Sequence, residues 1–168
     1  MLNVLFVSTE NAIRSIMAEA ILNSPAHSQG RFQAYSAGSQ PRGSVDAGAI
    51  ETLDRLGIST EGLRSKSWDE FSGSGAPNID FVVTLCDQPA ESCPVWPGHP
   101  VSAHWGVPVP VAPEGDDDAK RGALEEAARV IGRRIELFAL LPLEELERMG
   151  QEQQLQALDS TDSNPSLT

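Results

Sequence analysis

The hydrophobic and polar positions at the start of the chain predict a strand, a loop and a helix in succession. Residues 4–7 form an apolar run rich in valine, and a polar stretch follows from Ser8 to Asn11. Beyond it, apolar residues recur at the spacing of a helix. They are Ile13, Ile16, Met17, Ala20 and Ile21. The first part of the chain is therefore interpreted as one βα unit.

Three further segments have the composition of strands. They are residues 32–38, 79–85 and 101–103. Between the last two, closely spaced proline and glycine residues disfavour regular structure and predict a long surface loop. Because helical segments and short links alternate with the strands, we expect an α/β fold with a four-stranded parallel sheet flanked by helices.

Three later segments carry signals for the start or the end of a helix. Ser44 is a candidate N-cap for a helix that stops at Gly57, after turn residues at 24–30. The pattern Ser67-Trp68-Asp69-Glu70 has the form of a capping box and predicts a short helix. Residues 116–141 predict a long amphipathic helix with three aspartates at its positive end.

The predicted domain covers residues 1–142, because Pro142 ends the long helix. A weaker amphipathic helix is predicted for residues 143–158, followed by a disordered tail at 159–168. Two interpretations of the second helix stay open. Its apolar stripe either docks on the parent domain or binds a partner.

Length, composition and charge exclude several classes of protein. The 168 residues fit one domain, and without a long apolar run the chain has no predicted membrane span or membrane partner. The chain enters a strand directly at its start, so we expect no leader segment and a soluble, cytoplasmic protein. The net charge of −12 would repel nucleic acid, and we expect no such partner.

The loop after the first strand is a candidate anion site. A loop between a strand and a helix directs backbone N–H groups and the positive end of the helix dipole at one point. Arg14 would add a planar guanidinium suited to the oxygens of an oxyanion. Without further support, an ordinary first βα unit with a surface arginine explains the same residues.

The chain has two cysteines, Cys86 and Cys93, separated by six residues. In a reducing compartment such a pair favours redox or metal chemistry, and two ligands alone make a poor zinc site. The pair would either oxidise as a redox switch in the flexible loop or have no shared role. In the second case Cys86 is a small buried residue at the end of a strand.

Several motifs resemble those of a known family. Ser8, five residues and Arg14-Ser15 resemble the Cys-x5-Arg-Ser/Thr loop of the low-molecular-weight protein tyrosine phosphatase superfamily. Other segments resemble its thioredoxin-coupled arsenate reductase branch. They are Tyr35-Ser36-Ala37-Gly38, Leu63-Arg64-Ser65-Lys66-Ser67-Trp68, Val83-Thr84-Leu85-Cys86-Asp87, Cys93-Pro94-Val95-Trp96-Pro97 and His104-Trp105-Gly106-Val107-Pro108.

The resemblance implies a phosphate loop after the first strand, at the switch point of the sheet, and arsenate, phosphate or sulfate as its ligand. The implied oxyanion-binding residues are Ser8, Thr9, Glu10, Asn11, Ala12, Ile13 and Arg14. In this scheme Asn11 braces the loop, and the Ser15 hydroxyl forms a hydrogen bond with the nucleophile at position 8.

The chain departs from the family pattern at three positions. Ser8 stands where the family has its cysteine nucleophile, and a serine hydroxyl is far harder to ionise than a thiol. Glu10 replaces a glycine, so its carboxylate either faces the anion or turns to solvent. Val109 stands at the position of the aspartate that acts as general acid, and valine has no proton to donate.

The resemblance also bears on metals and partners. Some family reductases hold a potassium ion through residues that match Asn11, Glu19 and Ser36, but Lys66 stands at the fourth ligand position. Because its ammonium would replace the ion, we expect no metal and no cofactor. In the reductases, a pair matching Cys86 and Cys93 forms a disulfide that thioredoxin reduces, which makes thioredoxin a candidate partner.

Three hypotheses follow. The leading one is a family member that has lost cysteine-dependent catalysis and binds an oxyanion or acts as a redox-regulated protein. The second is an arsenate reductase or phosphatase whose nucleophilic cysteine has been mutated to Ser8. The third is a protein-interaction module that uses the acidic surface and the helix at 143–158.

Overall fold

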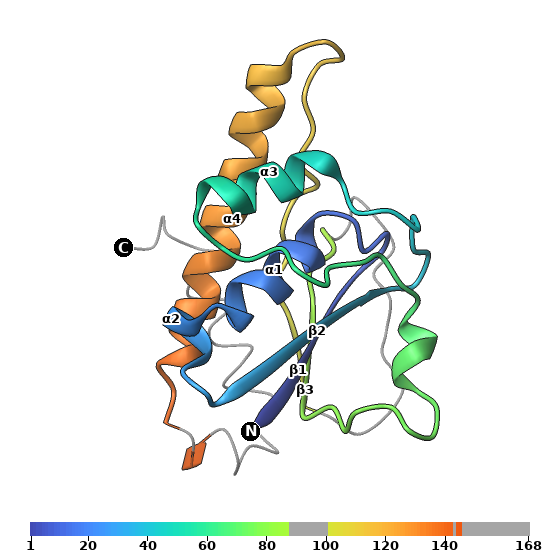
Figure 1. The fold of residues 1–168 in the computed structure, drawn as a ribbon, viewed down its shortest axis with the longest axis vertical. Coiled ribbons are helices and arrows are strands. Elements are labelled where there is room, and N and C mark those ends of the chain that lie inside the picture. Colours follow the sequence, from blue (N-terminus) through green and yellow to red (C-terminus); the bar gives the residue numbers. More distant parts are fainter. Residues whose placement is uncertain (88–100, 143, 146–168) are drawn as a thin grey trace.

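A computed structural model describes residues 1–87, 101–142 and 144–145 of the chain (Figure 1). Its centre is a four-stranded parallel sheet in the order β2-β1-β3-β4. The strands are β1 (Leu2–Ser8), β2 (Phe32–Gly38), β3 (Phe81–Thr84) and β4 (Val101–His104). The predicted α/β class and the parallel sheet are therefore confirmed.

Strand β1 lies inside the sheet and pairs with β2 on one side and β3 on the other. In register, Ser8 at its end lies opposite Gly38 of β2, and Val7 lies opposite Thr84 of β3. The chain leaves β1 for one edge strand and later returns to the other side of β1. The loop that follows β1 consequently opens at the switch point of the sheet, as predicted.

The two faces of β1 are buried against different elements. Val4 and Phe6 join the main core with the helices α1 (Arg14–Asn23), α3 (Ala47–Arg55) and α4 (Asp117–Ala139). Leu5 and Val7 face the opposite side and pack near the short helix η1 (Trp68–Phe71). Because side chains alternate along a strand, a run that is apolar at every position is what a strand buried on both faces requires.

The starts of two helices differ from the sequence prediction. The N-cap of α3 is Asp46, whose side chain accepts a hydrogen bond from the Gly48 N–H, so the prediction of Ser44 was wrong. The turn predicted at 24–30 contains one helical turn, α2 (Pro25–Ser28). Proline at the first position of a helix loses no hydrogen bond, which allows this turn.

Helix η1 forms where the capping box predicted it, but only half of the box is present. The Ser67 side chain accepts a hydrogen bond from the Asp69 N–H. The Glu70 carboxylate instead binds the Arg64 guanidinium through two hydrogen bonds, of 3.0 and 2.5 Å. A bidentate pair with a charged donor outcompetes the single bond to a backbone N–H.

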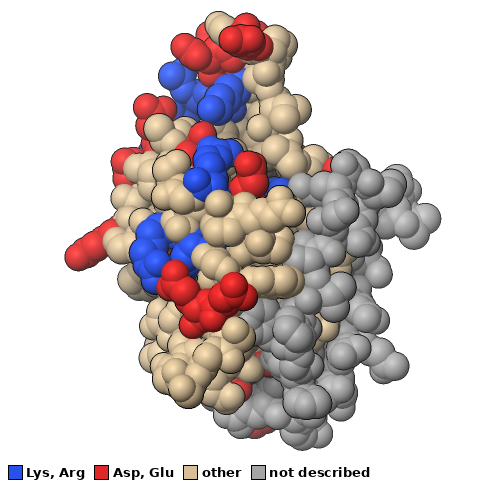
Figure 2. Space-filling model, turned by 90° about the vertical axis from the view of Figure 1, so that its right-hand side faces the viewer, with Lys and Arg blue, Asp and Glu red and all other residues tan. Residues whose placement is uncertain are grey.

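The long helix α4 begins after its N-cap Asp116 and ends at Ala139, two residues short of the predicted Leu141. Acidic side chains gather at the end of the molecule from which α4 starts (Figure 2). Within the described residues, no helix is long and apolar enough to cross a membrane. The predicted helix at 143–158 and the tail at 159–168 lie outside the described residues, apart from 144 and 145.

Candidate oxyanion site

The candidate site is the loop from Ser8 to Arg14, which joins β1 to α1. The Arg14 side chain is buried and crosses to the neighbouring strands at the switch point. One of its terminal nitrogens donates to the Leu85 carbonyl at 3.2 Å and to the Val107 carbonyl at 3.0 Å. Leu85 follows β3 and Val107 follows β4, so these two segments hold the guanidinium beside the loop.

Three carbonyl groups of the loop accept hydrogen bonds from backbone N–H groups outside it. The pairs are Gln40 to Thr9 at 2.9 Å, Arg42 to Glu10 at 2.9 Å and Asp46 to Ala12 at 3.0 Å. In a trans peptide the carbonyl and the next N–H point in opposite directions. The N–H groups of residues 10, 11 and 13 therefore point to the side away from these donors, into the concave face of the loop.

The start of α1 leaves this concave face electropositive. Its N-cap is Ile13, which has no side chain to accept a hydrogen bond, and its first turn contains no acidic residue. Asn11 adopts a left-handed backbone with φ of 48°, a conformation that asparagine tolerates and that curls successive amides toward one point. The arrangement has the form of an anion-binding nest at a helix N-terminus.

The Ser8 hydroxyl lies inside a buried chain of hydrogen bonds. Its Oγ is 2.6 Å from the Ser15 Oγ and accepts the Asn11 N–H at 3.3 Å. The Asn11 side-chain amide donates to the Ser15 Oγ at 2.8 Å. The predicted hydrogen bond between Ser15 and position 8 is therefore present in the structure. The Asn11 side chain, which was predicted to brace the loop, binds Ser15.

Glu10 turns its carboxylate away from the loop. Its side chain is 56% exposed and lies 3.5 Å from the guanidinium of Arg42. Of the two orientations left open by the sequence, the one toward solvent is observed. The loop thus closes without placing a negative charge on its concave face.

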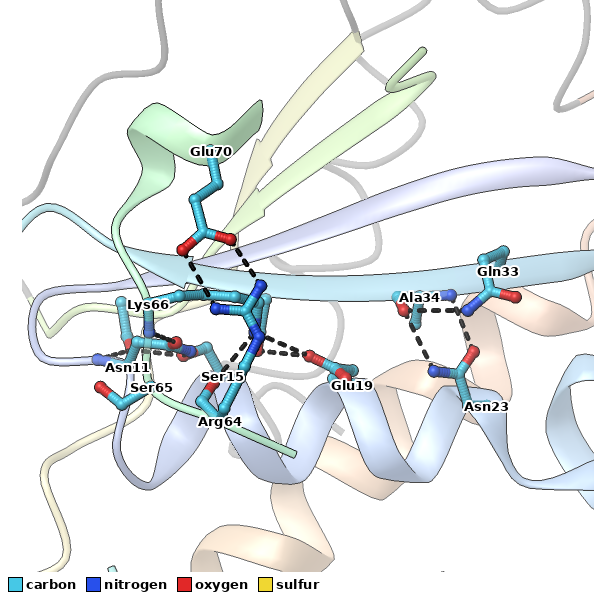
Figure 3. A network of polar contacts seen from close by, with 12 residues as sticks. Asn11, Ser15, Glu19, Asn23, Gln33, Ala34, Arg64, Ser65, Lys66 and Glu70 are labelled. Atoms are coloured by element: carbon cyan, nitrogen blue, oxygen red, sulfur yellow. Dashed lines mark hydrogen bonds and ion pairs between the residues drawn. The ribbon is translucent and has the colours of Figure 1, made fainter. Parts of the chain in front are cut away.

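A buried cation lies behind the loop. The Lys66 ammonium is 3.6 Å from a Glu19 carboxylate oxygen and 3.5 Å from the Ser36 hydroxyl, which itself donates to Glu19 (Figure 3). Burial lowers the pKa of Lys66, and the Glu19 charge opposes that shift. Because a positive charge already faces these oxygens, the residues do not fit a bound potassium ion.

The backbone of the Lys66 segment holds the loop directly. The Lys66 N–H donates to the Asn11 side-chain oxygen at 2.8 Å, and the Ser65 hydroxyl donates to the Glu10 carbonyl at 3.1 Å (Figure 3). We call residues 64–66 the strap. Ser65 lies in one of the segments that resemble the family, but the sequence predicted no role for it, because a serine in a polar segment is common.

Gly38 is a second residue whose role the sequence did not reveal. A Cβ built at this glycine would lie 2.7 Å from the Thr9 carbonyl oxygen and 3.1 Å from the Asn11 backbone nitrogen. Real Cβ atoms do not approach backbone so closely, so any side chain here would displace the loop. The sequence placed Gly38 at the end of a strand and in the segment Tyr35-Ser36-Ala37-Gly38, which resembles the family, but neither signal indicated this close approach.

The remaining predicted residues lie beyond the loop. Val109 is 40% exposed and follows the contact between Arg14 and Val107 by two residues. Cys86 is fully buried just after β3 and is disulfide-bonded. Cys93, the other cysteine of the sequence, lies outside the described residues. Among those residues, no three His, Cys, Asp or Glu side chains gather as a metal site.

A parallel sheet with a loop of this form between its first strand and its first helix defines an α/β protein with a candidate phosphate loop. The profile of the family described as low molecular weight phosphotyrosine protein phosphatase matches residues 3–149. An arsenate reductase of Shouchella clausii is 31% identical over 134 residues, which are 80% of this chain and 92% of that protein. The chain therefore belongs to this family, in which its relatives include arsenate reductases.

Solved structures agree with this assignment. An arsenate reductase of Archaeoglobus fulgidus is 29% identical, with a TM-score of 0.62 over 81% of this chain and 98% of its own. An arsenate reductase in a phosphate-binding state is 22% identical, with a TM-score of 0.64 over 83% and 97%. A cysteine-to-serine variant of the YwlE arginine phosphatase, with a phosphorylated active-site serine, is 18% identical, with a TM-score of 0.58 over 90% and 100%. The last two show likeness of fold alone.

Proposed function

We propose that this chain binds a tetrahedral oxyanion such as arsenate, phosphate or sulfate in the Ser8–Arg14 loop and has lost the cysteine-dependent turnover of its family. One observation carries the proposal. Three carbonyl groups of the loop accept hydrogen bonds from residues outside it, so the amides that follow them face the concave side, where the start of α1 has no capping side chain. An anion there would satisfy these donors and the helix dipole together.

Two side chains support an anion as the ligand. The Arg14 guanidinium is held by carbonyl groups at the mouth of the loop, where it would neutralise part of the charge of an oxyanion. The Thr9 hydroxyl oxygen is buried and has no hydrogen-bond partner among the described residues. A buried hydroxyl in that state costs about 1–3 kcal/mol, and a bound oxyanion or its water would remove that cost.

Loss of turnover follows from the chemistry of two residues. An alcohol at the position of the nucleophile is rarely ionised near neutral pH, whereas a thiol at a helix N-terminus is partly thiolate. Val109, which the resemblance places at the general-acid position, cannot protonate a departing oxygen. General acid catalysis contributes about 10²–10⁴-fold, so its loss compounds the change of nucleophile.

Isothermal titration calorimetry with arsenate, phosphate and sulfate tests the binding. We expect saturable binding that weakens about 100-fold or more in Arg14→Ala, because a charged hydrogen-bond donor to the ligand is removed. Arg129→Ala is the matched control, since Arg129 pairs with Glu126 on the exposed surface of α4. No heat with any of the three anions, or equal affinity in both variants, would refute the proposal.

A second candidate is an active reductase or phosphatase in which a cysteine has been replaced by Ser8. The hydrogen bonds that Ser15 and Asn11 make with position 8 favour it, because the Asn11 N–H and a Ser15 hydroxyl that donates would stabilise a thiolate there. Turnover of arsenate with thioredoxin, or of an aryl phosphate, by Ser8→Cys but not by the parent would support this candidate. An inactive Ser8→Cys variant with intact anion binding would leave the binding protein as the better account.

The cysteine pair adds a redox element to both candidates. Cys86 is disulfide-bonded in the structure, which supports a role as a reducible group near the loop. We infer that thioredoxin is the reductant. Thiol titration before and after incubation with thioredoxin and its reductase tests this, and no gain in thiols would count against it.

A further inference from the structure

We propose that the C-terminal segment, residues 143–158, folds back as a helix and docks along α4. The docking surface consists of two adjacent hollows that share His27 of α2 and Glu136 of α4. Helices α2 and α4 lie against each other (Figure 1). We call the two hollows together the trough. Its apolar lining includes Ile21, Leu56, Ile58, Ala128, Leu140 and Leu141.

The trough is separate from the candidate oxyanion site. Ile21, which lines it, lies near the C-terminal end of α1, whereas the Ser8–Arg14 loop leads into the start of that helix. Docking there is therefore independent of the proposed function. A failure of one leaves the other standing.

The surface of the trough has features of a face that another helix covers. Leu56 in one hollow is 56% exposed, and Leu140 in the other is 78% exposed. Gly132 of α4 also lines the trough, and a Cβ built there would meet nothing within 4 Å. A glycine costs the interior of a helix about 1 kcal/mol relative to alanine, but it lets another backbone approach closely.

The chain leaves α4 at one end of the trough. The Arg31 guanidinium donates to the carbonyls of Ala139 and Leu141, which fixes this end of the helix. Pro142 lines the trough, and the chain is helical again at 144–145. The short stretch between the two helical parts has the length that joins antiparallel helices.

The segment matches the trough in length and in its apolar positions. At 1.5 Å per residue, a helix over 143–158 would be about 24 Å long, and the part of α4 that lines the trough, 125–139, is about 22 Å long. Apolar residues of the segment stand mostly at intervals of three, so successive pairs are neighbours on the surface of a helix. They are Leu143, Leu146, Met149, Leu155 and Leu158.

The charge of the segment favours the same arrangement. It contains four glutamates and one arginine. Arg133 lines the trough and forms no ion pair among the described residues. In an antiparallel pair of helices that turns at Pro142, Glu152 lies opposite Arg133, because it is ten residues after the proline and Arg133 is nine before it. The short tether gives the segment an effective concentration of about millimolar, which favours it over a free partner.

Hydrogen exchange of the purified full chain, followed by mass spectrometry, tests the docking. We expect the amides of 146–158 to exchange at least about tenfold more slowly than those of an unstructured peptide. Gly132→Glu fills the trough with a charge of the same sign as the segment and should remove this protection. Leu56→Glu, at an exposed side chain of the trough, should act in the same way.

Gly122→Glu is the matched control. Gly122 is also in α4 and also has open space at its Cβ, but it does not line the trough. The segment should stay protected in this variant. The amides of α1 should stay protected in every variant, which shows that the domain remains folded.

A charge exchange tests the register. Arg133→Glu should reduce the protection of the segment about threefold, because it puts two acids opposite each other. Adding Glu152→Arg to that variant should restore the protection. Equal protection in the parent, the single variant and the double variant would overturn the proposed register.

Three further results would overturn the docking itself. Exchange of the segment at the rate of an unstructured peptide would mean that it does not dock. Protection that survives both Gly132→Glu and Leu56→Glu would place the segment elsewhere. Protection that rises with protein concentration, together with a dimer in sedimentation, would make a second copy of the chain the occupant.

Discussion

Helices α1 and α4 begin in opposite ways. α4 starts with Asp116, whose carboxylate accepts the Ala119 N–H at 2.9 Å, and with two more aspartates in its first turn. α1 starts with Ile13, without a capping side chain and without an acid in its first turn. Helix α4 neutralises the positive end of its dipole with its own aspartates. Helix α1 leaves the positive end of its dipole available to an anionic ligand.

An uncapped helix N-terminus points to a ligand when hydrogen bonds fix the backbone around it. Three carbonyl groups of the loop before α1, those of Thr9, Glu10 and Ala12, accept hydrogen bonds from residues outside the loop, so its backbone conformation is fixed. A loop with a fixed backbone that leads into an uncapped helix is typical of an anion-binding site.

Lys66→Met should cause the largest loss, because it leaves the Glu19 carboxylate without its buried positive partner. Removing one partner of a buried pair costs about 3–5 kcal/mol. The loop would also lose the charge that fixes the strap behind Asn11. Urea denaturation should show a lower midpoint, and Lys66→Met with Glu19→Gln should recover most of it. An unchanged midpoint in the single variant would show that the pair does not support the loop.

The same lysine predicts a pH dependence. Burial lowers the pKa of Lys66 below the ordinary 10.5, so the unfolded chain binds this proton more tightly than the folded one. Stability from this group therefore rises with pH between the lowered value and 10.5. The rise should be absent from the double variant, measured by denaturation at several alkaline pH values. Equal slopes in the two proteins would contradict it.

Ile13→Asp would give α1 the kind of start that α4 has. The new carboxylate would accept the first N–H groups of the helix and repel an oxyanion. We expect the affinity for phosphate in calorimetry to fall about tenfold or more, since a cap and its charge are each worth about 1 kcal/mol. Ile13→Asn is the matched control, which caps without charge and should fall less. Equal affinities in the parent and in both variants would contradict the claim that an anion binds at the start of α1.

Asp116→Ala is the reciprocal change at α4. It should cost about 1 kcal/mol of unfolding free energy, the usual value of a lost N-cap. The affinity for phosphate should not change, because α4 satisfies its start without a ligand. Asp118→Ala, which removes a highly exposed acid of the first turn, should cost less. A fall in anion affinity in Asp116→Ala would contradict the distinction between the two helices.

Glu10→Gln should have the smallest effect. The carboxylate is more exposed than buried and contacts Arg42 on the outer side of the loop. Exposed pairs contribute about 0.2–1 kcal/mol, so stability and anion affinity should change little. A large gain in affinity in calorimetry would mean that the Glu10 charge faces the anion.

The strands and helices around the site could largely be predicted from the sequence, because the spacing of apolar residues follows the buried face of each element. The apolar run at residues 4–7 and the helical spacing after it located the strand, the loop and the helix of the site. The N-cap of α3 was missed because Ser44 and Asp46 are both good caps. A tertiary bond from the Asp46 N–H to the Ala12 carbonyl fixes the chain at that point, and no local pattern encodes it.

The parts of the site that escaped prediction are those made by contacts across the chain. Gly38 matters because the loop leaves no room for a Cβ at this position, which only the folded register reveals. The Ser65 hydroxyl donates to the Glu10 carbonyl, 55 residues away in the sequence, and accepts the Gly43 N–H. The roles of Glu19 and Lys66 were predicted from the family resemblance alone. Residues that are far apart in the sequence leave no local pattern that would indicate their contact.

The central claim is that the amides of the Ser8–Arg14 loop hold an oxyanion at the uncapped start of α1. Titration of ¹⁵N-labelled protein with phosphate, followed by amide NMR, tests it directly. The account predicts saturable shifts at the amides of Glu10, Asn11 and Ile13 and none at the first turn of α4. Shifts confined to surface segments around Lys120 and Arg121, with the loop amides unmoved, would contradict it.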